Sequence, residues 1–404
     1  MATEVFKFGG SSVGSLERIQ HVARLIKEKK REIDNLVVVV SAMQGKTDEL
    51  LDMAKFFTEI PDERETDLLL SSGERISSSL LAIALDSIGC RAISMTGRQV
   101  GMQTDDAHTR ARIRSIKTDK IWKNLQEGRV AVVAGFQGID KNGDVTTLGR
   151  GGSDTSAVAL AAALRADKCI IYTDVAGVYT ADPRIVKKAS IIKNISYDEM
   201  MELASLGAKV LQIRSVEMAE RYNVTIVVKS TFEPTLPGTV IAKEGKMENR
   251  AVSGITGDKD QAKITILEVP DKLGIAAAIF KKLSEKKIIV DMIVQNISDK
   301  GMTDISFTVP ADEIIAAKQV IEPACNELNV KAIKTDKDVA KVSVVGVGMR
   351  NHYGVASDMF EALSQEGINI AAITTSEIKI SCLIEERYFE LALRALHNKF
   401  MGGR

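Results

Sequence analysis

The stretch Lys7-Phe-Gly-Gly-Ser-Ser-Val-Gly14 follows a short apolar run and leads into a helical pattern, and it decides how the N-terminal half folds. Two consecutive glycines let backbone N–H groups approach a phosphate without a Cβ in the way. The N-terminus of the following helix adds a partial positive charge, and Lys7 can neutralise charge on a transferring phosphoryl group. The stretch therefore predicts a phosphate site at a strand-to-helix turn. A tight turn with an exposed lysine would give the same pattern.

Outward from this stretch, apolar runs alternate with helical patterns up to about residue 230. The predicted strands are residues 37–40, 91–95, 130–135, 168–173 and 224–228, and the predicted helices are residues 15–30, 47–57, 65–85, 153–164 and 209–221. Buried strands separated by helices are typical of an α/β fold, a mostly parallel central sheet covered by helices on both faces. We expect this catalytic domain to occupy residues 1–245.

A second glycine-rich turn, Thr146-Thr-Leu-Gly-Arg-Gly-Gly-Ser-Asp-Thr155, enters an alanine-rich helix. The Arg150 guanidinium can form a forked contact with a carboxylate. Asp154, in the first helical turn, can organise cationic groups around phosphates. Ser153 and Asp154 could instead be helix caps, but capping explains neither Arg150 nor the paired glycines.

A third polar segment, Tyr172-Thr-Asp-Val-Ala-Gly-Val-Tyr-Thr-Ala-Asp-Pro-Arg184, follows a buried strand. Thr173 and Asp174 fall at the carboxyl end of that strand, where ligands collect in open α/β sheets. The Asp182-Pro turn presents Arg184, and Tyr179 could border a nucleotide base. The segment therefore predicts part of a nucleotide site.

Glu74 in Ser71-Ser-Gly-Glu74 interrupts a helical pattern beside a glycine. It could hold a substrate ammonium group, and an exposed helix glutamate explains the pattern equally well. Familiar nucleotide motifs fail: Gly45-Lys-Thr47 lacks the first P-loop glycine because position 40 is Val40, and the 149–152 glycines lack the third glycine of a dinucleotide fingerprint.

The C-terminal part contains an internal repeat. Residues 271–284 align without gaps on residues 351–364, at an offset of 80 residues. Two copies of one supersecondary unit are expected, after a linker at residues 233–238 and 243–250. The second copy ends without its last strand, and residues 251–256 could supply it, because an unpaired edge is a liability in a small sheet. We therefore predict a first module at residues 263–335, inserted into a second at residues 250–260 and 338–404.

Bulk composition excludes several classes. The chain has 404 residues, of which 54 are basic and 54 acidic, so net charge favours neither nucleic acid nor membrane as a partner. The four cysteines and four histidines are scattered, which predicts reduced thiols and no protein metal site. No apolar signal core begins the chain, and no apolar run approaches the ~18 residues that span a bilayer. We expect a cytoplasmic protein.

Taken together, these motifs resemble the aspartokinase family of the amino acid kinase superfamily. The matching segments, in family order, are residues 7–14, 41–43 with 47–50, 72–74, 135–138, 149–154 and 173–184, and Ser11 stands where the family usually has threonine. The resemblance implies an aspartate kinase that converts ATP and L-aspartate into 4-phospho-L-aspartate and ADP, at the start of lysine, threonine and methionine biosynthesis. Magnesium would arrive bridging ATP oxygens.

Site residues follow from the resemblance position by position. The ATP site would comprise Lys7, Gly9, Gly10, Ser11, Thr173, Asp174, Tyr179, Asp182, Arg184 and Lys209, and the aspartate site Ser41, Thr47, Glu74, Phe136, Arg150 and Ser153. Lys7 and Asp154 would be the catalytic pair, with Asp154 orienting Lys7 rather than acting as a base. Glu74 would take the substrate ammonium and Arg150 a substrate carboxylate.

The repeated tail resembles ACT domains, which are βαββαβ modules that sense amino acids. The implied effector residues are Asp271, Gly274, Ile275, Ala276 and Gln295 of the first module, with Asn369 and Ile370 of the second. Lysine, threonine or both would inhibit by feedback. The resemblance implies that the modules form a homodimer. Two larger assemblies stay open: a higher oligomer, and an α2β2 form whose second subunit is translated from an internal start at Met247. Alternative functions are acetylglutamate, glutamate or UMP kinase, or an inactive amino-acid-binding regulator.

Overall fold

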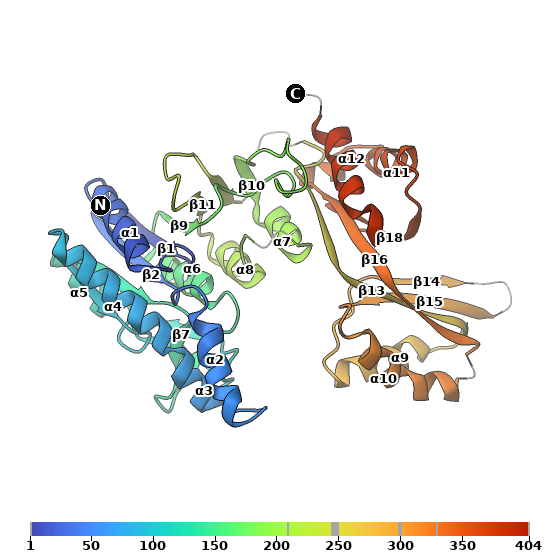
Figure 1. The fold of residues 1–404 in the computed structure, drawn as a ribbon, viewed down its shortest axis with the longest axis horizontal. Coiled ribbons are helices and arrows are strands. Elements are labelled where there is room, and N and C mark those ends of the chain that lie inside the picture. Colours follow the sequence, from blue (N-terminus) through green and yellow to red (C-terminus); the bar gives the residue numbers. More distant parts are fainter. Residues whose placement is uncertain (1, 208–209, 244–249, 298–300, 329, 403–404) are drawn as a thin grey trace. The chain divides into compact units, whose positions relative to one another are not determined.

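The computed structural model describes residues 2–207, 210–243, 250–297, 301–328 and 330–402, and the chain forms two compact units (Figure 1). Unit 1 comprises Met1–Val178, Ile191–Ala204 and Lys209–Lys246, and unit 2 comprises Tyr179–Ser190, Ser205–Ala208 and Met247–Arg404. Segment Tyr179–Ser190 thus belongs to unit 2, although it lies within the range expected for the catalytic domain. Its Ala181 and Val186 side chains are buried in the core of unit 2.

Unit 1 is built on an eight-stranded sheet. In sheet order, its strands are β10 (Asn194–Ser196), β12 (Thr239–Ala242), β11 (Ile226–Ser230), β9 (Lys168–Thr173), β1 (Thr3–Phe8), β2 (Asn35–Val40), β6 (Val130–Ala134) and β3 (Ala92–Met95). β11 and β12 are antiparallel and the other neighbours are parallel. This confirms the predicted α/β fold with a mostly parallel sheet.

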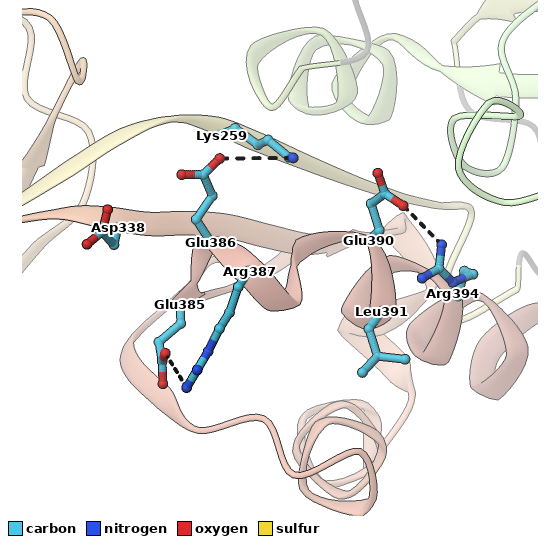
Figure 2. Close-up of a pocket in the computed structure, with 8 residues that line it drawn as sticks. All are labelled: Lys259, Asp338, Glu385, Glu386, Arg387, Glu390, Leu391 and Arg394. Atoms are coloured by element: carbon cyan, nitrogen blue, oxygen red, sulfur yellow. Dashed lines mark hydrogen bonds and ion pairs between the residues drawn. The ribbon is translucent and has the colours of Figure 1, made fainter.

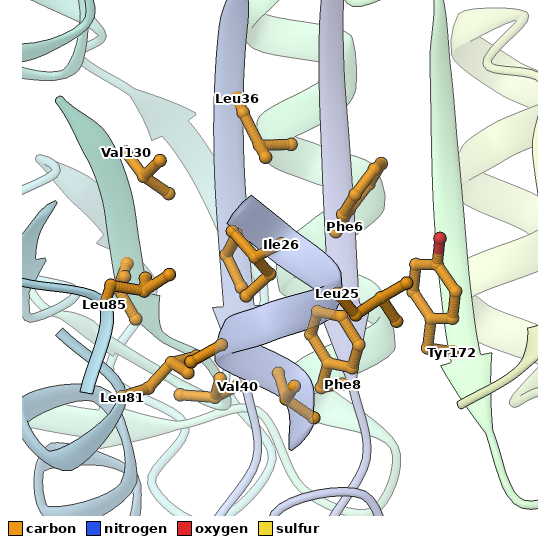
Figure 3. Packing of buried hydrophobic residues seen from close by; sticks show 14 of the residues in the cluster. Phe6, Phe8, Leu25, Ile26, Leu36, Val40, Leu81, Leu85, Val130 and Tyr172 are labelled. Carbon is orange, nitrogen blue, oxygen red and sulfur yellow. The ribbon is translucent and has the colours of Figure 1, made fainter. Parts of the chain in front are cut away.

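The alternation of side chains along β1 assigns them to opposite faces of the sheet. Phe6 and Phe8 pack in a core with helices α1 (Leu16–Lys29) and α4 (Ser72–Ser87), shown in Figure 3. Lys7 therefore points to the other face, where helix α6 (Gly152–Leu164) packs against β1, β2 and β9. A lysine within an apolar strand is thus brought beside the start of the alanine-rich helix.

The helical pattern predicted at residues 65–85 forms two helices, α3 (Glu63–Leu70) and α4, which meet at Ser71. By length and composition alone, the continuous segment Glu63–Ser87 could cross a membrane, but half of its apolar window is buried inside the fold. Leu81 and Leu85 are fully buried in the core of unit 1. We therefore interpret the segment as a core helix pair.

Two more helices of unit 1 were predicted with other bounds: α2 (Lys46–Phe57) and α8 (Ile213–Tyr222). The elements that were not predicted are α5 (Asp119–Gln126), α7 (Tyr197–Ser205) and a small sheet of β5 (Ile113–Ile116), β4 (Met102–Thr104), β7 (Gln137–Ile139) and β8 (Val145–Thr147). α8 begins at Ile213, four residues later than its pattern suggested. The small sheet matters for function because β8 leads directly into the glycine-rich turn.

Unit 2 contains one six-stranded antiparallel sheet. Its strands, in order, are β14 (Ile293–Ile297), β15 (Met302–Val309), β13 (Gly254–Pro270), β16 (Ala332–Val345), β18 (Lys379–Glu385) and β17 (Ile370–Thr375). Its helices are α9 (Ile275–Glu285), α10 (Ile314–Glu327), α11 (Val355–Gln365) and α12 (Phe389–Met401), with short 3₁₀ turns at Val347–Asn351 and Glu386–Tyr388. Strands β13 and β16 are long enough to serve both modules.

The first half of β13 supplies the strand that the second copy of the repeat lacks. Gly254 to Asp258 pair with Val345 to Lys341 of β16, whose same stretch pairs with β18. The second half of β13 pairs with β15 of the first module. A strand that precedes the first module in the chain therefore completes the sheet of the second.

The repeat is visible in the helices. Gly274 and Gly354 precede α9 and α11 with φ of 88° and 93°, a conformation that glycine adopts without strain. The buried faces of the two helices match at the 80-residue offset, as the pairs Ile275 and Val355, Ile279 and Met359, and Leu283 and Leu363 show.

Candidate active site

A pocket of about 280 Å³ opens in unit 1, at the carboxyl ends of β1, β2 and β6. Its lining includes nine of the predicted residues: Lys7, Gly10, Ser41, Thr47, Glu74, Phe136, Arg150, Ser153 and Asp154. Eight other lining residues were not named as site residues, although all except Gln44 and Gly45 lie in the segments that carry the family resemblance: Ala42, Met43, Gln44, Gly45, Asp48, Gly149, Gly151 and Gly152. Segments far apart in the chain therefore converge on one pocket.

Lys7 and Asp154 form a nearly buried ion pair in this pocket. Lys7 Nζ lies 2.6 Å from Asp154 Oδ1, with side-chain exposures of 11% and 10%. Asp154 occupies the first turn of α6, where a negative charge interacts favourably with the helix dipole. The pair therefore holds the ammonium group at the strand end, beside the glycine turn of residues 9 and 10.

Glu74 is 3% exposed, and one of its carboxylate oxygens has no hydrogen-bond partner within the described structure. Oε1 accepts a hydrogen bond from the Ala42 N–H at 3.0 Å, whereas Oε2 is unsatisfied. Gly73 makes this approach possible, because a Cβ there would lie 2.8 Å from the Ala42 Cβ. Burial raises the pKa of Glu74 to about 7. A buried carboxylate with a free oxygen is suited to a cationic ligand group.

Backbone hydrogen bonds of Phe136 hold the turn that carries Arg150. The Leu148 N–H donates to the Phe136 carbonyl at 2.8 Å, and the Phe136 N–H donates to Ser156 Oγ at 3.0 Å. Phe136 has a φ of 68°, a left-handed conformation that costs a bulky residue about 1–2 kcal/mol. Backbone strain at a pocket residue persists only where surrounding contacts impose it, so these hydrogen bonds fix the pocket wall.

Residues of the predicted phosphate site gather at the ends of β1, β9 and β11. The Gly9 N–H donates to the Tyr172 carbonyl at 3.3 Å, and Thr173 Oγ1 donates to Asp174 at 3.0 Å. A buried pair missed in the sequence, Ser12 and Thr231, joins the glycine turn to the end of β11 at 2.6 Å. The backbone of Ser11 is held by Arg18, which donates to its carbonyl at 2.7 Å.

The remaining predicted nucleotide residues belong to the other unit or are not described. Tyr179, Asp182 and Arg184 lie in the segment of unit 2 defined above. Asp182 and Arg184 form an ion pair at 2.7 Å, and the hydrogen bond from Arg184 lowers the pKa of Asp182. Lys209 lies outside the described residues, as does Met247.

The predicted effector residues lie around the start of α9 and on the strand edges of unit 2. Asp271, Gly274 and Gln295 are exposed, Ala276 is half-buried, and Ile275 is the buried first residue of α9. Asn369 is exposed and Ile370 begins β17. Tyr353, near the start of α11, is fully exposed.

Unit 2 has a larger hollow of about 640 Å³, drawn in Figure 2. Charged side chains line it and form three ion pairs: Lys259 with Glu386, Arg387 with Glu385, and Arg394 with Glu390. Such exposed pairs neutralise one another and contribute little energy. The smaller pocket, with its buried and unsatisfied carboxylate, is therefore the better candidate for a catalytic site.

The matches to known families follow the two units, except that the first match also includes Tyr179–Ser190 and Ser205–Ala208 of unit 2. Residues 2–230 match the amino acid kinase family, and residues 268–324 and 342–400 match the ACT domain. The fold and site thus define an amino acid kinase with a duplicated ACT region.

Relatives identify the kind of kinase. An aspartate kinase of Pseudomonas putida is 53% identical over 402 residues, which cover 99% of this chain and 98% of the relative. The crystal structure of E. coli aspartokinase III with aspartate and ADP matches with a TM-score of 0.80 at 25% identity, covering 98% and 99% of the two chains. The same enzyme with lysine and aspartate matches with a TM-score of 0.79, also at 25% identity, over 99% of each chain. This chain belongs to the aspartate kinase family.

Proposed function

We propose that the unit 1 pocket transfers the γ-phosphoryl group of ATP to the side-chain carboxylate of L-aspartate, giving 4-phospho-L-aspartate and ADP. The observation that carries this proposal is the convergence of four charged groups in one pocket: the Lys7–Asp154 pair, the Glu74 carboxylate and the Arg150 guanidinium. Glu74 binds the substrate ammonium through its free oxygen. Arg150 binds a substrate carboxylate.

The chemistry needs alignment and charge neutralisation. A carboxylate nucleophile is already ionised at neutral pH, so no general base is required. Lys7 stabilises the charge that develops on the phosphoryl oxygens, and Asp154 holds Lys7 in place. The glycine turn of residues 9 and 10, with Ser11, receives the phosphates, while Thr173 and Asp174 complete the site from β9.

Magnesium enters with the nucleotide in this proposal. In the described part of the chain, no group of three or more His, Cys, Asp or Glu side chains is placed to hold a metal ion. Mg²⁺ commonly keeps water and phosphate oxygens as most of its ligands, so a site with few protein ligands fits it. The ion would neutralise phosphate charge.

A trapping assay tests the reaction. With ATP, magnesium and aspartate, the purified chain is expected to form an acyl phosphate that hydroxylamine converts to aspartyl hydroxamate. Glutamate in place of aspartate is expected to give little hydroxamate, because its longer side chain misplaces the nucleophile relative to phosphorus. Absence of hydroxamate from aspartate, in a folded preparation that binds ATP, would reject the proposed reaction.

We further propose feedback inhibition by lysine, threonine or both at the ACT modules, as suits an enzyme at the start of their biosynthesis. Two observations support this: the duplicated module, and the lysine complex of E. coli aspartokinase III. The effector would contact Asp271, Gly274 and Gln295 of the first module, with Asn369 and Ile370 of the second. Pairing through exposed strand edges would make the modules a homodimer interface.

We propose the following domain limits: residues 1–245 for the kinase domain, residues 263–335 for the first ACT module, and residues 250–260 with 338–404 for the second.

Gln295→Ala is expected to weaken feedback inhibition without changing the uninhibited rate. Gln295 is exposed on β14, and its amide can hydrogen-bond a charged effector group. Loss of such a bond, worth about 1.5–3 kcal/mol, predicts roughly a ten- to hundredfold higher half-inhibiting concentration of effector. Gln319→Ala, at an exposed position on α10 of the same module, is the matched control. Equal inhibition of both variants would remove Gln295 from the effector site.

A further inference from the structure

The glycine-rich turn that carries Arg150 is clamped by a second arginine. Arg214 lies in the first turn of α8 and is half-buried. Its Nη1 donates to the Leu148 carbonyl at 2.8 Å, and its Nη2 donates to the Ala111 carbonyl at 2.7 Å. One guanidinium thus joins the residue before Gly149 to a segment almost forty positions earlier in the chain.

The two clamped carbonyls belong to one small framework. The Ala111 N–H donates to the Thr147 carbonyl at 2.9 Å, so the Ala111 segment runs alongside the end of β8. The same Leu148 that Arg214 holds through its carbonyl is held through its N–H by Phe136. Both polar groups of the Leu148 backbone are therefore fixed, two residues before Arg150.

The neighbour of Arg214 supports the turn from another side. Gln212, the residue that caps α8, packs directly on Gly151, where an added Cβ would lie 1.8 Å from the Gln212 Cγ. The start of α8 therefore contacts the turn on both sides of Arg150, through Gln212 and Arg214. Neither residue lines the pocket itself.

We infer that Arg214 is a positioning residue for substrate: it fixes the Leu148–Gly151 backbone so that Arg150 presents its guanidinium to the carboxylate of the amino-acid substrate. This inference rests on the proposed function. The planar fork of arginine suits the task because it donates to two carbonyls in fixed directions, whereas lysine offers a single point charge. A misplacement of about 1 Å in such a contact can lower the rate roughly a hundredfold.

Steady-state kinetics of Arg214→Met and Arg214→Lys test the inference. Arg214→Met is expected to raise the KM for aspartate roughly tenfold or more, with the KM for ATP changed less than about twofold, because the phosphate residues lie on other turns. Arg214→Lys, which can retain one of the two hydrogen bonds, is expected to fall between Arg214→Met and the wild type.

Two further variants separate positioning from general stability. Arg91→Met removes an exposed arginine that also donates to a backbone carbonyl, that of Glu127 at 3.3 Å, and is expected to leave both KM values unchanged. Gln212→Ala is a smaller change in the same support and is also expected to raise the KM for aspartate. It takes the place of Arg214→Met in the test if that variant does not fold.

The outcomes are distinct. A selective rise in the aspartate KM, graded through Arg214→Lys, supports the inference. Equal changes in both KM values, or a loss of activity that only tracks the folded fraction seen by near-UV circular dichroism, would overturn it. Failure of the proposed function shows separately, as absence of hydroxamate from the wild-type chain.

Discussion

Lys7→Ala is expected to lower kcat by roughly 10³-fold or more while the KM for aspartate changes little. Lys7 lies beside the glycine turn, where an added Cβ at Gly9 would be 3.4 Å from Lys7 Nζ. A positioned cation on a transferring phosphoryl group is commonly worth about 10³–10⁵ in rate. No nearby group replaces it in the described pocket, where Arg150 is placed in a different turn. Hydroxamate formation at saturating ATP and aspartate measures the loss.

The same substitution also leaves Asp154 buried without its partner. Removing one member of a buried ion pair typically destabilises a protein by about 3–5 kcal/mol, so Lys7→Ala alone would confound catalysis with unfolding. The double variant Lys7→Ala/Asp154→Asn removes the uncompensated charge. We expect it to recover much of the thermal stability and none of the turnover.

Lys168→Ala is the matched control for this experiment. Lys168 starts β9, next to β1, and pairs with Glu4 at 3.0 Å at the opposite end of the strands. Its removal is expected to leave kcat near the wild-type value. A stable Lys7→Ala/Asp154→Asn protein that still turns over at a tenth of the wild-type rate would refute the catalytic role of Lys7.

Glu74→Gln is expected to raise the KM for aspartate by roughly a hundredfold or more. The amide keeps the shape and can still accept the Ala42 hydrogen bond, but it loses the charge that would pair with the substrate ammonium. Losing one partner of a desolvated charge pair costs about 2–5 kcal/mol in binding. The exposed Glu63→Gln, on the neighbouring helix α3, is the control and should bind aspartate normally.

The KM for aspartate is expected to rise as the pH falls. Because the pKa of Glu74 is about 7 in the folded chain, the carboxylate is increasingly protonated below pH 7, and the aspartate KM should rise toward tenfold per pH unit. Glu74→Gln should lack this dependence. A wild-type KM that stays constant between pH 8 and pH 6 would contradict the assignment.

Stability should change in the opposite direction to activity. The folded pKa of Glu74 is raised from 4.5, so its contribution to stability is full below pH 4.5 and is lost as the pH rises through about 7. The lost contribution is about 3 kcal/mol at pH 8. Glu74→Gln should therefore raise the thermal midpoint at pH 8, and the gain should shrink toward pH 5. Melting curves at the two pH values measure it.

Most of the fold could be predicted because its signals are local. The strand at 168–173 and the helices around residues 16–29 and 153–164 have clear apolar patterns, and the structure has them at nearly the predicted bounds. The small four-stranded sheet was missed because its strands have three or four residues each and carry no usable alternation. The continuity of β13 across both modules depends on tertiary pairing, which no local pattern encodes.

The candidate site also has residues that the sequence indicates and residues that only the fold reveals. Glycines close to charged residues mark Lys7, Arg150 and Asp154 in the sequence, because phosphate and carboxylate binding needs these residue types beside an open backbone. Arg214 has no such mark: it lies in an ordinary amphipathic helix, and its role depends on which carbonyls the fold brings to it. The strained backbone of Phe136 is equally invisible before the coordinates are known.

The assignment of Tyr179–Ser190 to unit 2 limits how the protein can be divided. Thr180 Oγ1 lies 3.0 Å from Nε2 of the buried His397, and Ala181 and Val186 fill the core around α12. A regulatory fragment obtained by cleavage between residues 243 and 250 would lack all three side chains. Part of the core of the sensing region is therefore encoded within the kinase half of the gene. A recombination event at the linker would replace the ACT modules but leave behind the core residues that the kinase half supplies to them.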